Sequence, residues 1–183
     1  MRFPKQPPDY IQQGVKALTH YDIPGAYRAF AAAYQHHNWE TRDLAVTALG
    51  DMLDVAVYEG KRKPGVLVII QSKEDLTFQA ANAPVDPPRL MVLLEGFLQR
   101  ALVPPQTLAE QKYLSALRDT LALVEKILLN DPHHLVRFSA FIVLDHILGK
   151  DRQHFIVDTL RQALRQEPHP ALCAALDEAL KRG

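Results

Sequence analysis

The chain has 183 residues, of which 48% are hydrophobic and 23% are charged, and its 21 Lys and Arg residues balance 21 Asp and Glu residues. This length allows one domain with a sizeable core that needs no disulfide or metal, and the neutral balance excludes an overall field that would attract nucleic acid or an anionic membrane. Cys173 is the only cysteine, which excludes an internal disulfide, and because we find no signal peptide and no long apolar segment in the sequence, we expect a cytoplasmic protein.

The pattern of apolar residues predicts a single all-α domain over residues 1–183, without strong signals for a second domain. Its expected parts follow in chain order: an extended, proline-rich lead-in over residues 1–8, N-terminal helices over 9–59, an irregular insertion over 60–88 and C-terminal helices over 89–183.

Two N-terminal helices are predicted on either side of a turn at residues 21–24, the first beginning near Asp9 and the second covering 25–35. Their small and aromatic residues resemble a tetratricopeptide repeat at four positions: Gly14, Ala26, Phe30 and Ala33. The resemblance implies an antiparallel helical hairpin in which small residues let the two helices approach and the phenylalanine fills the space between them.

A third helix is predicted over residues 40–58, with Leu44 and other apolar residues on its buried side. The insertion that follows begins with a basic loop, Lys61, Arg62 and Lys63, and continues with an apolar run at 66–70 that suits either a short strand or a buried turn of helix. Ser72 and Asp75 then suggest a capped short helix that ends at Ala81.

Two further helices are predicted on the C-terminal side of the insertion, one from Pro88 to about Ala101 and a long one over residues 107–129. The long helix carries leucine and valine at alternating three- and four-residue spacings, which indicates a straight packing seam. Packing within the chain is favoured because two heptads are too few for a coiled coil, although a homodimer through this helix stays open.

A turn followed by a helix then occurs twice. The first copy begins at Asp131-Pro132, where the acid caps the helix and proline fits its first turn, and Gly149 is expected to end that helix. A second helix is expected from about Arg152. The turn pattern restarts at Glu167-Pro168 with an offset of about 36 residues, and a self-match at this period is typical of helical repeat arrays.

The first copy resembles the HEAT-like repeats through six residues: Asp131, Pro132, Val136, Arg137, Ala140 and Leu144. The resemblance implies antiparallel helical hairpins stacked as a short right-handed α-solenoid, with Asp131 and Arg137 in a hydrogen-bonded ladder between repeats. Thr41-Arg42 echoes Val136-Arg137, which makes Arg42 a third ladder residue whose own turn, His36-His37, lacks the acid. In the second copy Cys173 replaces the arginine, so any ladder is expected to stop there.

Signatures of catalysis are mostly absent from the sequence, and a metal site could form only from histidines that are distant along the chain. No serine lies in a Gly-x-Ser-x-Gly setting, and the eight glycines form no phosphate-binding loop. Cys173 is interpreted as a small core residue, Asp51 and Asp54 as a solvated face, and the adjacent histidine pairs point their rings too far apart to hold one ion unaided. We therefore predict no catalytic, cofactor-binding or metal residue.

These observations favour a non-catalytic helical-repeat scaffold that binds another protein, of an identity the sequence does not reveal. The main alternative is an enzyme or cofactor-handling protein of HEAT-like type, either similar to the bilin lyases or dependent on a metal. A DNA-binding repeat is the third hypothesis. It is disfavoured because the only basic patch, Lys61 to Lys63, is three residues long and would release few counterions.

Overall fold

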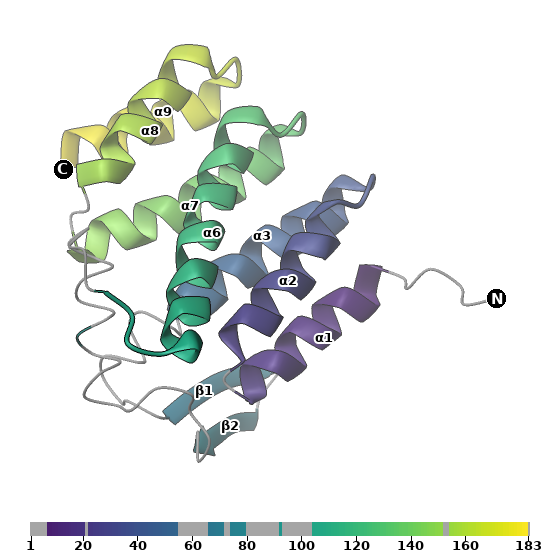
Figure 1. Ribbon diagram of the computed structural model, residues 1–183. Helices are drawn as coiled ribbons and strands as arrows, with labels where there is room; N and C mark the ends of the chain where they lie inside the picture. The colour runs from purple at the N-terminus through teal and green to yellow at the C-terminus, as the bar shows by residue number, and fades with distance from the viewer. Residues whose placement is uncertain are drawn as a thin grey trace.

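The computed structural model describes residues 7–20, 22–54, 66–71, 74–79, 92, 104–151 and 154–182 of the chain. These residues form seven α-helices and one two-stranded β-hairpin (Figure 1). The helices are α1 (Pro7–Thr19), α2 (Ile23–Tyr34), α3 (Trp39–Asp54), α6 (Leu108–Asn130), α7 (His134–Asp151), α8 (His154–Gln166) and α9 (Pro170–Arg182). The body of the protein is therefore all-α, as the sequence predicts.

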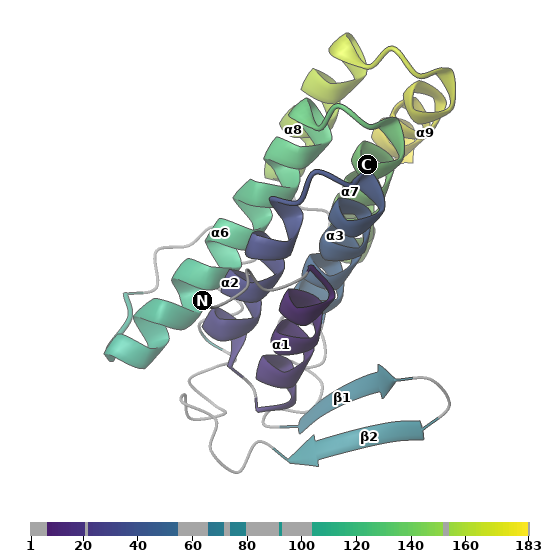
Figure 2. The same cartoon turned by 90° about the vertical axis from the view of Figure 1, so that its right-hand side faces the viewer.

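The helices lie in two layers (Figures 1 and 2). Helices α2, α6 and α8 pack side by side in one layer, called here the α2 layer, and α1, α3, α7 and α9 pack side by side in the other, the α3 layer. Successive helices α2 and α3, α6 and α7, and α8 and α9 pair across the two layers. One continuous core fills the space between them, and its largest fully buried side chains are Tyr113, Phe30, Ile23, Leu49, Met52, Leu53 and Leu117.

Both N-terminal helices begin slightly earlier than predicted because proline is accepted in the first turn of a helix. Pro7 and Pro8 belong to α1, so the predicted lead-in is shorter, and residues 1–6 lie outside the described part. Helix α2 begins at Ile23 because the Asp22 carboxylate accepts the N–H of Gly25 at 2.9 Å.

Helices α1 and α2 make close contact at Gly14. A methyl group at this position would lie 2.1 Å from Cε1 of Phe30, which is fully buried. The small residue and the aromatic ring therefore fit together as the sequence predicts for this hairpin.

Gly14→Ala is expected to lower the free energy of unfolding by about 1 to 3 kcal/mol, because the added methyl group forces the Phe30 ring or helix α1 to move. Urea unfolding followed by circular dichroism measures the loss. Gln12→Ala, on the exposed side of the same helix, is the control and should change stability by less than about 0.5 kcal/mol. A Gly14→Ala protein as stable as the control would show that the contact is easily relieved.

The insertion contains a β-hairpin in place of a predicted helix. Strand β1 (Val66–Gln71) pairs antiparallel with β2 (Glu74–Gln79), with Val66 opposite Gln79. The apolar run at 66–70 is thus a strand, and the predicted short helix ending at Ala81 is wrong. Its residues Leu76, Thr77 and Phe78 alternate between apolar and polar, and Thr77 and Phe78 favour strands, which outweighs the capping motif.

Other predictions for this region fall on residues that the structure does not describe. They are the basic loop Lys61 to Lys63, the loop at 82–88, and, apart from residue 92, the predicted helix from Pro88 to Ala101.

Helix α6 has a reciprocal cap at its start and is buried along its seam. Thr107 Oγ1 accepts the N–H of Glu110 at 3.1 Å, and the Glu110 carboxylate accepts the N–H of Gln106 at 2.7 Å. The predicted seam packs within this chain, and its buried members are Leu114, Leu117, Leu121, Val124 and Leu128. Contacts with α2 and α8 make α6 the central helix of its layer, and α6 also packs on α7 of the other layer.

Helix α7 continues through Gly149 to Asp151, so the predicted stop at Gly149 is wrong. A glycine inside a helix costs about 1 kcal/mol, which is too little to end a helix that packs on α3 and α6. Among the helices described above, none has the length and apolar content needed to cross a membrane.

Candidate functional site

Three turns of the chain share one hydrogen-bonding pattern. They are the first turn (36–39) before α3, the second turn (131–134) before α7 and the third turn (167–170) before α9. In each, the side chain of the first residue accepts the backbone N–H of the third. The three bonds are Asn38 N to His36 Nδ1 at 3.2 Å, His133 N to Asp131 Oδ1 at 2.8 Å and His169 N to Glu167 Oε1 at 2.9 Å.

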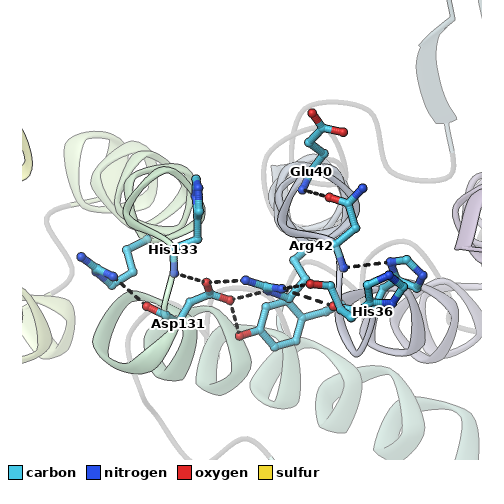
Figure 3. A network of polar contacts seen from close by, with 9 residues as sticks. His36, Glu40, Arg42, Asp131 and His133 are labelled. Carbon is cyan, nitrogen blue, oxygen red and sulfur yellow. Dashed lines mark hydrogen bonds and ion pairs between the residues drawn. The ribbon is translucent and has the colours of Figure 1, made fainter.

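Two arginines connect these turns in series. Arg42, on α3, donates from Nε and Nη2 to the two carboxylate oxygens of Asp131 at 2.8 and 3.1 Å (Figure 3). Arg137, on α7, makes the same paired contact with Glu167 at 2.7 and 2.6 Å. Each arginine thus binds the acid of the next of the three turns, with the two-pronged geometry that suits guanidinium and carboxylate. These four residues are called the arginine ladder below.

The contacts at the two ends of the ladder differ from those expected from the sequence. The first turn contains no acid, so the sequence suggested that Arg42 has no acidic partner. In the structure Asp131 of the second turn is that partner. Arg137 Nη1 also donates to the carbonyl oxygen of Asp131 at 2.8 Å. Cys173 takes the corresponding place after the third turn, where its half-buried thiol donates to the carbonyl oxygen of Glu167 at 3.0 Å. Cys173 is therefore a capping contact and not the core residue that we predicted.

Asp131 is the most enclosed member of the ladder, with 3% of its surface exposed. Tyr34, from α2, donates its hydroxyl to the same carboxylate at 2.9 Å. Burial raises the pKa of Asp131, but the hydrogen bonds from Arg42, from the His133 N–H and from Tyr34 outweigh burial and hold the pKa below its usual value. Burial and the bond to Asp131 raise the pKa of Tyr34.

Glu167 is held in the same way at the other end of the ladder. Burial raises its pKa, while the hydrogen bonds from Arg137 and from the His169 N–H lower it, with a net lowering. Only 2% of the Glu167 side chain is exposed. Both carboxylates are therefore ionised at neutral pH, which is the state that the arginines require.

A column of stacked rings runs beside the ladder across the three turns. Trp39 stacks on His133 with ring centres 4.2 Å apart, His133 on His134 at 5.0 Å, and His134 on His169 at 4.3 Å. Desolvation and the neighbouring imidazoles of His169 and His133 lower the pKa of His134. The near-parallel rings do not converge on one point, and within the described residues no three His, Cys, Asp or Glu side chains could hold a metal ion.

We expect the protein to lose stability in acid through both the ladder and the column. Asp131, Glu167 and His134 all have folded pKa values below their unfolded values, so each contributes stability above its unfolded pKa and loses it as the pH falls through its folded pKa. The loss should begin below 6.5, the ordinary value for His134, and steepen below 4.5 and 3.8, the ordinary values for Glu167 and Asp131.

Urea unfolding of the wild type and of Asp131→Asn, from about pH 7 to about pH 3, measures this dependence. The variant cannot ionise at residue 131, so its stability should fall less steeply in the acid range. Equal slopes for the two proteins would contradict the assignment.

A groove lies between α3 and α7 in the α3 layer. It contains a pocket of about 470 Å³, lined by Thr47, Gly50, Asp51, Ser139, Ile142, Val143 and His146. Gly50 lets the helices approach, because a methyl group there would lie 2.5 Å from Cγ2 of Val143. Ser139 donates its hydroxyl to Asp43 at 2.6 Å and ties the two helices together.

Exposed apolar side chains flank this groove on both helices. Ile142, in its wall, and Leu44, one helical turn before Thr47, are each 52% exposed, and Leu135, one turn before Ser139, is 43% exposed. Single exposed apolar residues are ordinary, but a group along one groove marks a candidate binding surface. Leu44 was predicted on the buried side of α3; it is exposed because Ala45, Val46 and Leu49 occupy the core-facing positions.

Sequence reasoning singled out Arg42, Asp131 and Arg137 but left Glu167 out of the ladder, and it missed the groove and the ring column. The column does have a signal, because the repeat offset aligns Trp39 with His134, so that rings recur in successive turns. The groove has none, since its walls come from helices about 95 residues apart. Asp51, predicted on a solvated face, is exposed but lines the pocket, and the side chain of Asp54 is not among those described.

No known family model, curated protein sequence or solved structure matches this chain. Function must therefore be argued from the groove and from the contacts that hold its walls.

Proposed function

We propose that the chain is a short HEAT-like α-solenoid that acts as a non-catalytic scaffold and binds another protein in the groove between α3 and α7. Two layers of paired helices and three turns of the same hydrogen-bonding pattern support the repeat assignment. The contact of Gly14 with Phe30 supports a tetratricopeptide-like hairpin at the N-terminal end.

The groove with its exposed apolar rim is the observation that carries this proposal. Its walls are held from two directions, by the Ser139 to Asp43 hydrogen bond within it and by the bond from Arg42 to Asp131, which joins α3 to the turn that starts α7. A surface held in its binding shape loses little conformational entropy when a partner binds, which favours affinity. The ladder would then serve the function by positioning the groove.

The chemistry of the pocket favours binding over catalysis. Ser139 is its best nucleophile by residue type, but the hydroxyl donates to Asp43, which leaves no imidazole to activate it. His146 is seven residues further along the same helix, a rise of about 10 Å. The serine of the pocket is therefore paired with a carboxylate and not with an imidazole.

Site-specific photocrosslinking in cells that make the protein tests this proposal. A benzophenone side chain at Thr47, in the groove, should form a covalent adduct with a partner that mass spectrometry identifies reproducibly. The same group at Ala122, an exposed position of α6, is the control. Adducts at Thr47 should disappear when Ile142→Asp is added, and adducts that form equally from both positions or survive that substitution would refute the proposal.

A further inference from the structure

We propose that the column of stacked rings is a pH-sensitive joint: mild acid raises the population of molecules in which the hairpin of α8 and α9 has separated from α7 while the other helices stay folded. The contact that carries this proposal is the stack of His134, at the start of α7, on His169, in the turn before α9. The two ring centres are 4.3 Å apart and the ring planes are 5° apart. Two imidazoles so close repel each other when both are protonated. The proposal is independent of what binds in the groove.

The charged groups around this contact do not compensate for added protons. Among the described residues, Arg137 on the same helix adds positive charge at His134, and the carboxylate of Glu167 in the third turn adds negative charge. Because these two groups form an ion pair with each other, neither is free to offset an imidazolium. The other ion pair of the ladder, Arg42 with Asp131, is neutralised in the same way. Burial, the two neighbouring imidazoles and Arg137 outweigh Glu167 and lower the pKa of His134.

The stacked contact between the first and second turns responds to acid in the opposite sense. Trp39, in the first turn, stacks on His133 with ring centres 4.2 Å apart. An imidazolium over the face of an indole is attracted by the electrons of the ring, so protonation of His133 keeps α3 and α7 together. Acid should therefore loosen the third turn from the second and leave the second turn joined to the first.

The hairpin of α8 and α9 is also placed to separate on its own. The two helices lie at one end of both layers and pack on α6, α7 and each other (Figure 1). A hairpin at the end of a repeat array opens at a lower free-energy cost than the whole array. The ion pair of Arg137 with Glu167 persists in mild acid, since the pKa of Glu167 is lowered. Opening is therefore a minor population that acid increases, and the hairpin does not detach completely.

Hydrogen exchange of the full-length protein, followed by mass spectrometry at about pH 7.5 and about pH 5, tests this proposal. Each rate is divided into that of the unfolded chain at the same pH, which gives a protection factor for each segment. Protection over α8 and α9 should fall by about tenfold in acid, because a group protonated only in the open state contributes up to about tenfold per pH unit below its open-state pKa. At about pH 5 it should also lie at least about tenfold below the protection over α3 and α6.

Variants that cannot be protonated separate the joint from other effects of acid. His134→Phe keeps a ring in the column and should reduce the effect of pH on α8 and α9 to less than about threefold. His169→Phe removes the same pair of imidazoles from the other side, so it serves as the test if His134→Phe does not fold. His20→Phe, at an exposed histidine of the N-terminal hairpin, is the control and should retain the tenfold effect. Equal protection over all helices in acid, or a pH effect that survives in His134→Phe or in His169→Phe, would overturn the proposal.

Discussion

Asp131→Ala is expected to lower the free energy of unfolding by about 3 to 5 kcal/mol, the usual result of removing one partner from a buried ion pair. Its carboxylate accepts two hydrogen bonds from Arg42, one from Tyr34 and one from the His133 N–H. The alanine variant leaves the guanidinium of Arg42 mostly enclosed, at 13% side-chain exposure, without its counter-charge. Urea unfolding at neutral pH measures the loss.

A matched control is available at Asp158, whose ion pair with Arg161 is highly exposed. Asp158→Ala should change stability by no more than about 0.5 kcal/mol, as exposed pairs do. The double variant Asp131→Ala with Arg42→Ala should be less destabilised than the sum of the two single variants, because it leaves no unpaired charge. A loss below about 1 kcal/mol for Asp131→Ala would show that water replaces the contacts of the ladder.

Arg137→Ala is expected to cost a similar amount, about 3 to 5 kcal/mol. A single hydrogen bond between Arg137 and a buried acid would account for about 1 to 3 kcal/mol. The structure raises that figure because both prongs of the guanidinium bind Glu167, whose side chain is only 2% exposed, and a third bond reaches the carbonyl oxygen of Asp131. Arg137→Lys should recover only part of the loss, since an ammonium cannot form the paired contact.

The buried charge of Glu167 separates this explanation from a simple loss of packing. Adding Glu167→Gln to Arg137→Ala removes that charge and should restore part of the stability, whereas lost packing would not be restored. Arg161→Ala, at an exposed pair, serves as the control for removal of an arginine. If adding Glu167→Gln lowers the stability of the Arg137→Ala protein further, the unpaired carboxylate is not the source of the lost stability.

Helices with a clear apolar stripe were predicted well because the stripe records which side of the helix is buried. Helix α6 was expected over 107–129 and is observed over Leu108–Asn130, and α9 follows the predicted turn at Glu167 to Pro170. Prediction failed where two local signals competed. Around Glu74–Gln79 a capping motif suggested a helix, while the alternation of side chains suited a strand. Pairing with β1 stabilises the strand.

In the candidate site, too, some residues were predicted from the sequence and others were not. Arg42, Asp131 and Arg137 were recognisable because they recur at fixed places in a repeated pattern. Their partners were not, because Arg42 and Asp131 are 89 residues apart and only the stacking of α7 beside α3 brings them within 2.8 Å. The same stacking sets Gly50 against Val143 and so forms the groove.

By itself the sequence determined the helical class, the position of most helices and the recurrence of Arg42, Asp131 and Arg137 in a repeated pattern, since each depends on spacing along a few turns of chain. The tertiary structure alone decided which acid meets which arginine, that Leu44 faces outward, and that a groove lies between α3 and α7. These outcomes depend on the relative placement of helices that are distant in the chain, and that placement is set by the packing of the whole core.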